Sequence, residues 1–186
     1  AVSTSEQLRL LDATVLLAGA GGLGGYVLEL LARFGVGRIV VDSFDELDRL
    51  ERLHAVDGIV PSVLLRITPG VEAHTHEFVM TGQDDSKFGF GLKVGDAARA
   101  VARATASPAV ELVGLHAHIG SQVFVAGFFE QAVEALAPFV HECGLPELSI
   151  GGGIGVAYVE GEEAPSIAEW GAVVRRACDE DRKSVV

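Results

Sequence analysis

Cysteine is scarce in this sequence, whose 186 residues include only Cys143 and Cys178. Two cysteines so far apart exclude a disulfide-stapled scaffold and a zinc knuckle, because both need clustered cysteines. Each lies in or beside a segment with helical spacing, so we expect two ordinary buried thiols.

Positive charge is also in short supply, with 14 Lys and Arg against 26 Asp and Glu. A nucleic-acid partner is not expected, since binding a phosphate backbone requires clustered basic side chains. The apolar runs, such as residues 59–65, end well before the ~20 residues that span a membrane. Residues 1–9 carry no signal-peptide pattern. We therefore expect a cytoplasmic protein with a small-molecule partner.

Clusters of metal ligands are lacking as well. His116 and His118 alternate along one predicted strand and so share a face. No third ligand has suitable local spacing, and two histidines do not make a metal site. The sequence predicts no metal centre.

What the chain does contain is an alternation of short β-branched runs and segments with helical spacing, with 49% hydrophobic residues. This length and composition indicate one domain, residues 1–186, with a sizeable core. Strands that alternate with helices predict an α/β fold with a mostly parallel sheet of about five strands. The strands are expected at residues 14–18, 38–41, 62–67, 110–116 and 147–150.

Three predicted helices have recognisable N-terminal signals. Ser43 with Glu46, and Ser166 with Glu169, have the spacing of capping boxes. Asp96 is expected to cap an Ala-rich helix that runs to residue 106.

A glycine-rich stretch, residues 19–25, follows the first predicted strand and opens a helix. Backbone N–H groups at Gly19, Gly21 and Gly24 could approach a phosphate at the positive end of that helix. Asp42, at the end of the next strand, could accept a hydrogen bond from a ribose hydroxyl. The pattern indicates a site for ATP or NAD, or else a plain tight turn.

Residues 8–37 resemble the first unit of the ubiquitin-activating-like adenylyltransferases of thiamine and molybdopterin biosynthesis, whose glycine loop binds ATP. The resemblance stops after the second strand. That family continues with an Asp-x-Asp pair and a stretch like Ser-Asn-Leu-Asn-Arg-Gln, whereas this chain reads Asp-Ser-Phe-Asp-Glu-Leu at residues 42–47. The residues that hold ATP and magnesium in that family are therefore missing.

A second resemblance begins at Arg38 and runs to about residue 180. Five blocks, at residues 40–47, 64–70, 85–90, 114–122 and 148–155, come in the order found in the barrel domain of pyridoxal-phosphate (PLP) dependent diaminopimelate decarboxylases. The resemblance implies part of an alanine-racemase-like (β/α)8 barrel. It also implies PLP as the cofactor, diaminopimelate as the amino-acid substrate and a place in lysine biosynthesis.

The same resemblance implies where PLP would bind. Its pyridine ring stacks on His118, and Arg66 meets the cofactor or a carboxylate near it. A glycine turn at the C-terminal end of a barrel strand and a nearby hydroxyl hold the phosphate. The residues implied for this cradle are Gly151, Gly152, Gly153 and Ser121.

The family's Schiff-base lysine has no counterpart in this sequence. It lies in a Tyr-Ala-x-Lys type motif on the first barrel strand, whereas the lysines here are Lys87, Lys93 and Lys183, none in such a motif. Lys87 matches a loop lysine of the family. We therefore assign no catalytic residue and expect non-covalent PLP binding at best, without decarboxylation. Members of the family act as dimers, so a homo-oligomer is possible.

These patterns favour a chimera, with a Rossmann-like unit at residues 8–37 joined to a partial PLP-binding barrel at 38–180. The strands could form either a partial barrel or an open doubly wound sheet, because both folds use the same right-handed crossover unit. Two other functions stay open. The chain could be a nucleotide-binding module or a folding unit without activity.

Overall fold

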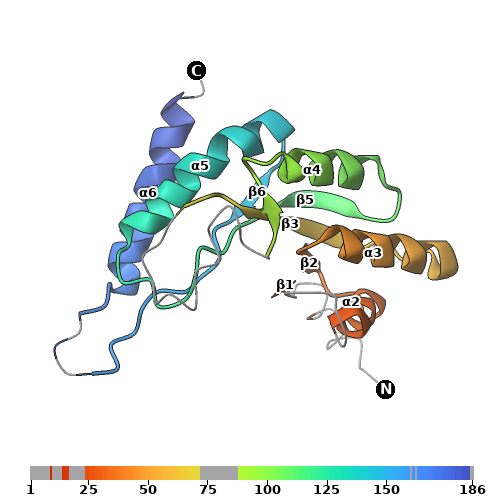
Figure 1. The fold of residues 1–186 in the computed structure, drawn as a ribbon, viewed down its shortest axis with the longest axis horizontal. Helices are drawn as coiled ribbons and strands as arrows, with labels where there is room; N and C mark the ends of the chain where they lie inside the picture. Colours follow the sequence, from red (N-terminus) through yellow and green to blue (C-terminus); the bar gives the residue numbers. More distant parts are fainter. Residues whose placement is uncertain are drawn as a thin grey trace.

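The computed structural model describes residue 9 and residues 14–16, 24–71, 88–159, 161 and 163–184. Its centre is one sheet in which every pairing between strands is parallel (Figure 1). The main path has five strands, and a short sixth, β4 (Phe90–Gly91), pairs with β3. The five are β1 (Thr14–Leu16), β2 (Arg38–Val41), β3 (Ser62–Thr68), β5 (Glu111–His116) and β6 (Glu147–Ser149).

The strands lie side by side in chain order, β1-β2-β3-β5-β6. A doubly wound sheet would reverse its order at a switch point, whereas barrel strands follow one another around the sheet. Within the described residues the order therefore excludes the doubly wound alternative. The predicted parallel α/β sheet is confirmed, with the order of a partial (β/α)8 barrel.

The helices follow one another in an arc around the outer side of the strands (Figure 1). The exception is the last helix, which packs on the helix before it rather than on the sheet. Helix positions agree with the spacing of apolar residues in the sequence. In the part of the chain that the structure describes, the helices are α2 (Gly24–Arg33), α3 (Phe44–Asp57), α4 (Asp96–Ala106), α5 (Gly127–Cys143) and α6 (Ile167–Ser184).

The capping predictions have three different outcomes. Ser166 and Glu169 form the complete reciprocal box at the start of α6. At α3, Ser43 Oγ accepts from the N–H of Glu46 at 3.4 Å, and the Glu46 carboxylate accepts a hydrogen bond from Asp42 N–H. The prediction for Asp96 is wrong, because the N-cap of α4 is the preceding glycine.

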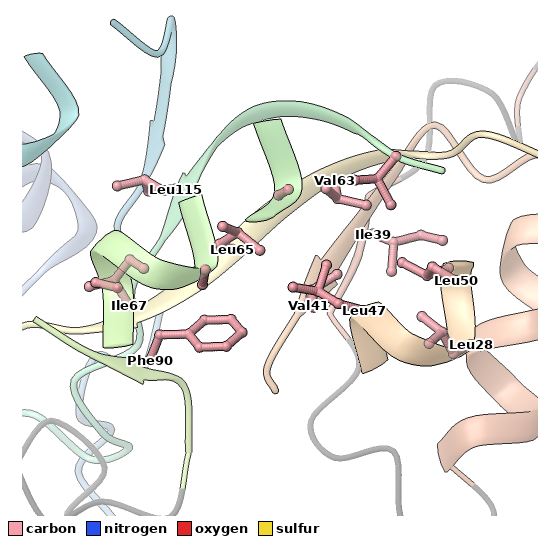
Figure 2. Packing of buried hydrophobic residues seen from close by; sticks show 14 of the residues in the cluster. Leu28, Ile39, Val41, Leu47, Leu50, Val63, Leu65, Ile67, Phe90 and Leu115 are labelled. Atoms are coloured by element: carbon pink, nitrogen blue, oxygen red, sulfur yellow. The ribbon is translucent and has the colours of Figure 1, made fainter. Parts of the chain in front are cut away.

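The main hydrophobic core lies between the sheet and its helices. Alternate strand residues, among them Val41 and Leu65, are fully buried and meet Leu47 and Leu50 from α3 (Figure 2). Phe90 of β4 closes the core with an edge-to-face contact to Phe44, their ring centroids 4.9 Å apart. Each fully buried side chain of this size contributes about 1.5–3 kcal/mol. This face of the sheet therefore supplies much of the stability.

The intervening residues of the same strands point to the opposite face, and toward the C-terminal ends of the strands they are polar. Asp42, Arg66, Thr68 and His116 are all at most 5% exposed. Polar groups that are buried this deeply must be paired to be tolerated. The functional site is therefore sought at this end of the sheet.

Two expectations concern regions away from the sheet. Cys143 and Cys178 are free thiols and are half-buried rather than buried. No helix in the described part of the chain is long and apolar enough to cross a membrane.

Candidate functional site

Four polar side chains form a row across the C-terminal ends of the strands. Arg66 on β3 pairs in register with His116 on β5, which pairs in register with Ser149 on β6. Asp42 directly follows β2 and reaches Arg66 from the other side. We call these four residues, Asp42, Arg66, His116 and Ser149, the polar row.

Arg66 is the buried cation of the row. Its Nη1 donates to Asp42 Oδ1 at 2.9 Å, and both side chains are 5% exposed. The guanidinium carbon also lies 5.0 Å from the centroid of the Phe88 ring. A buried charge persists only when it is paired, and these two contacts hold the guanidinium in one orientation.

His116 continues the row toward β6. Its Nδ1 lies 2.9 Å from Ser149 Oγ. Burial, together with the charges of Arg66 and the neighbouring His118, lowers the pKa of His116 to about 4. At neutral pH the imidazole is therefore uncharged.

His118 lies in the loop just after β5 and is half-buried. Burial lowers its pKa, and the nearby Arg66 adds to this effect. The His118 imidazole is therefore uncharged at neutral pH and lies within reach of the Arg66 charge, at the end of the sheet.

The glycine turn after β6 packs directly on the loop that carries His118. A Cβ on Gly151 would lie 2.5 Å from the carbonyl oxygen of Ala117, and one on Gly153 would lie 1.9 Å from that of Gly120. Both glycines have positive φ angles, +68° and +103°, which favour glycine. By contrast, a Cβ on Gly152 meets nothing within 4 Å. The turn is therefore fixed by its neighbours while its middle residue faces open space.

Gln122 ties the two loops together. Its amide oxygen accepts from Val156 N–H at 3.0 Å and its amide nitrogen donates to the Val156 carbonyl at 3.3 Å. Backbone bonds between Val123 and residues 153 and 155 add to this link. Gln122 adopts a positive φ of 57°, unusual for a residue with a side chain. The exposed Ser121 is held next to the glycine turn as a result.

The structure thus brings most of the predicted PLP contacts to one place. A Cβ on Gly151 would lie 3.2 Å from His118 Nδ1, and a Cβ on Gly153 would lie 3.3 Å from Ser121 Cα. Arg66 is near enough for its charge to lower the pKa of His118.

The predicted nucleotide site is only partly described. Gly19 and Gly21 lie outside the described residues, while Gly24 begins α2. Asp42 lies at the end of β2 as expected, but its carboxylate is bound by Arg66. Of the lysines, Lys93 is exposed in the turn before α4, and Lys87 lies outside the described residues.

Sequence reasoning missed three members of this site. His116 was given a role only as a possible metal ligand, and Ser149, although it lies in the matched block 148–155, was given no role. Glu46 was predicted as a capping residue, yet it is fully buried, and burial together with the Asp42 charge raises its pKa to about 7. The alternation of β5 and β6 was the available signal, because it places His116 and Ser149 on the polar face.

Comparisons with known proteins agree with this geometry. The family model for the pyridoxal-dependent decarboxylases, pyridoxal-binding domain, matches residues 26–184. The diaminopimelate decarboxylase of Halalkalibacterium halodurans is 42% identical over 149 residues, 77% of this chain and 34% of that protein. That of Mycobacterium tuberculosis is 44% identical over 158 residues, 78% of this chain and 35% of that protein.

Solved structures give the same result. The crystal structure of Helicobacter pylori diaminopimelate decarboxylase, complexed with L-lysine, superposes with a TM-score of 0.76 at 30% identity. It covers 83% of this chain, which in turn covers 40% of that protein. The chain spans about a third of the length of the curated relatives that it matches.

Proposed function

Because this chain belongs to the pyridoxal-dependent decarboxylases, we propose that it forms one side of the PLP site of a diaminopimelate decarboxylase. The main support for this proposal is the glycine turn at residues 151–153. It packs on the loop that carries His118 and leaves the Gly152 position open to a ligand. The proposed substrate is diaminopimelate and the product lysine. This assignment rests on the named relatives and on that cradle.

The residues fit the cofactor. The open position at Gly152 gives a phosphate room to approach backbone N–H groups, and Ser121 adds a hydroxyl beside them. The uncharged ring of His118 offers a flat surface on which a pyridine ring can stack. Arg66, fixed by Asp42, provides a positive charge for the cofactor or for a carboxylate near it.

The bound cofactor would supply the electron sink that decarboxylation needs. The described residues would bind and orient it, whereas a covalent attachment requires a lysine. We propose that the chain as given binds PLP without a covalent bond and does not decarboxylate, since none of its three lysines lies in the family's motif.

A PLP titration of the purified chain tests this proposal. We expect saturable binding by absorbance and no mass increase after borohydride treatment. An adduct that borohydride fixes onto one lysine would show instead that Lys87 or Lys93 takes the missing role. Absence of saturable binding would reject the proposed PLP site.

The glycine turn offers a sharper test. Gly152→Ala should leave the melting temperature nearly unchanged, because its Cβ meets no protein atom within 4 Å, yet weaken PLP binding about tenfold or more by occupying the phosphate approach. Gly171→Ala on α6, where a Cβ also meets nothing, is the matched control and should leave PLP binding unchanged. If both variants bind PLP with equal affinity, the phosphate does not bind at this turn.

Other features of the whole protein stay proposals. We retain a cytoplasmic location and a homo-oligomer, as the family suggests. The adenylyltransferase-like unit at residues 8–37, with its junction at residue 38, stays a proposal, and the decarboxylase family match already covers residues 26–37 of that unit. A rise in melting temperature with ATP or NAD would support the alternative nucleotide site at residues 19–24, and its absence would reject that site.

A further inference from the structure

His116 is a buried polar side chain that the contacts proposed above do not use. Only 5% of it is exposed, and it occupies the middle of the polar row, between Arg66 and Ser149. Its Nδ1 contacts Ser149 Oγ, whereas its Nε2 has no hydrogen-bond partner among the described residues. Leaving a buried polar atom without a hydrogen bond is energetically costly, so the unpaired Nε2 needs an explanation.

The orientation of the His116 ring indicates which group its Nε2 faces. The two nitrogens of an imidazole point in widely divergent directions, and Nδ1 points toward Ser149 on β6. Nε2 therefore points away from β6, on the side of β5 where β3 carries Arg66. The positive charge of Arg66 acts on this ring.

The charges then select one tautomer. An uncharged imidazole has one N–H donor and one acceptor nitrogen, whereas a guanidinium has donors only. The positive charge of Arg66 favours an acceptor lone pair at Nε2 and disfavours an N–H there. At the other nitrogen, Ser149 Oγ can accept a hydrogen bond from Nδ1–H. Both interactions therefore favour the tautomer that carries its proton on Nδ1.

We propose that His116 is a positioning residue, which donates its Nδ1 proton to Ser149 and turns the Nε2 lone pair toward Arg66. Arg66 is then supported within the sheet from both sides, by the Asp42 carboxylate and by the His116 imidazole. The consequence for PLP binding rests on the function proposed above. The tautomer itself does not.

The tautomer can be measured directly in the full chain without cofactor. Long-range ¹H–¹⁵N spectra at pH 7 should show a protonated Nδ1 and an unprotonated Nε2 for the signals that disappear in His116→Asn. Ser149→Ala should reduce the preference for this tautomer. A proton on Nε2, or a charged ring, would overturn the proposal.

Two substitutions then separate the nitrogens in a PLP titration. The amide of Gln can reach the position of Nε2, whereas the shorter Asn amide reaches only that of Nδ1. His116→Gln should stay within about threefold of the unmodified chain, and His116→Asn should bind PLP about tenfold more weakly. The same pair of changes at His141, 44% exposed on α5, serves as the control and should have no effect.

The outcomes distinguish the two proposals. Equal losses at His116, or no loss in either variant, would reject a role for Nε2 in orienting Arg66. If the unmodified chain binds no PLP, the proposed function fails, and the tautomer spectrum alone decides the role of His116.

Discussion

The two faces of the central strands are buried to a similar depth but are stabilised in opposite ways. On the helix-covered face, Val41 and Leu65 are 0% exposed among other apolar side chains. On the opposite face, their chain neighbours Asp42 and Arg66 are 5% and 4% exposed and form an ion pair. One residue along the strand changes the environment from apolar packing to buried charge.

The difference separates stability from function. Burying apolar side chains is favourable in itself, and it does not depend on one particular partner. Burying Arg66 is unfavourable unless Asp42 stays in place, and a buried ion pair is weak evidence for stability. We infer that the apolar face holds the fold, while the polar row is kept for binding. Substitutions on each face test whether stability depends on the apolar face and PLP binding on the polar row.

The largest effect is expected from Asp42→Ala. This change leaves the Arg66 guanidinium buried without its carboxylate, and breaking a buried pair in this way costs about 3–5 kcal/mol. Urea unfolding at pH 7 measures the loss. A loss below about 1 kcal/mol would mean that the guanidinium finds another partner or reaches water.

A double substitution provides the control. Asp42→Leu combined with Arg66→Met replaces the pair by apolar side chains, which is often neutral or stabilising. We expect the double variant to recover most of the stability and to bind PLP weakly or not at all. If it is as unstable as Asp42→Ala, the polar face contributes to stability directly.

Much of this arrangement was predictable from local patterns. The strand at residues 38–41 is confirmed with the predicted bounds, and the Ala-rich helix is confirmed with its predicted end at residue 106. Short-range periodicity determines both elements. The order of strands was not predictable in this way, since the same right-handed crossover unit builds doubly wound sheets and barrels.

A second, smaller effect concerns the pH dependence of stability at the junction of the two faces. Glu46 is 0% exposed, and its raised pKa of about 7 exceeds its ordinary value of 4.5. The folded state therefore holds this proton more tightly than the unfolded state. The resulting stabilisation is complete below about pH 4.5 and is lost as the pH rises through 7, by about 3 kcal/mol in all.

Glu46→Gln removes this titration and keeps an acceptor for Asp42 N–H. Subtracting its unfolding free energy from that of the unmodified chain, at pH values from 4.5 to 8, isolates Glu46. The subtraction is needed because His116, with a lowered pKa of about 4, has the opposite sign and adds stability as the pH rises toward 6.5. Parallel curves for the two proteins would show that the pKa of Glu46 is the same in the folded and unfolded states.

The site was less predictable than the fold. The sequence motifs indicated Arg66, His118 and the glycine turn, because these residues stand in contiguous blocks. The contacts within the polar row join residues that are 24 and 33 positions apart in the sequence. They depend on strand register, which one sequence does not reveal. Asp42 was therefore interpreted as a ribose acceptor, and its contact with Arg66 was missed.

The smallest effect is expected from Ile67→Val on the apolar face. Ile67 is 1% exposed in the main core and pairs in register with Phe90 of β4. Removing one methylene there should cost about 1 kcal/mol. This loss should be equal at pH 5 and pH 8, because no charge is involved, and PLP affinity should stay unchanged. A change in PLP affinity beyond about threefold would show that Ile67, next to Arg66 in the chain, couples the two faces, and the separation of stability from binding would then fail.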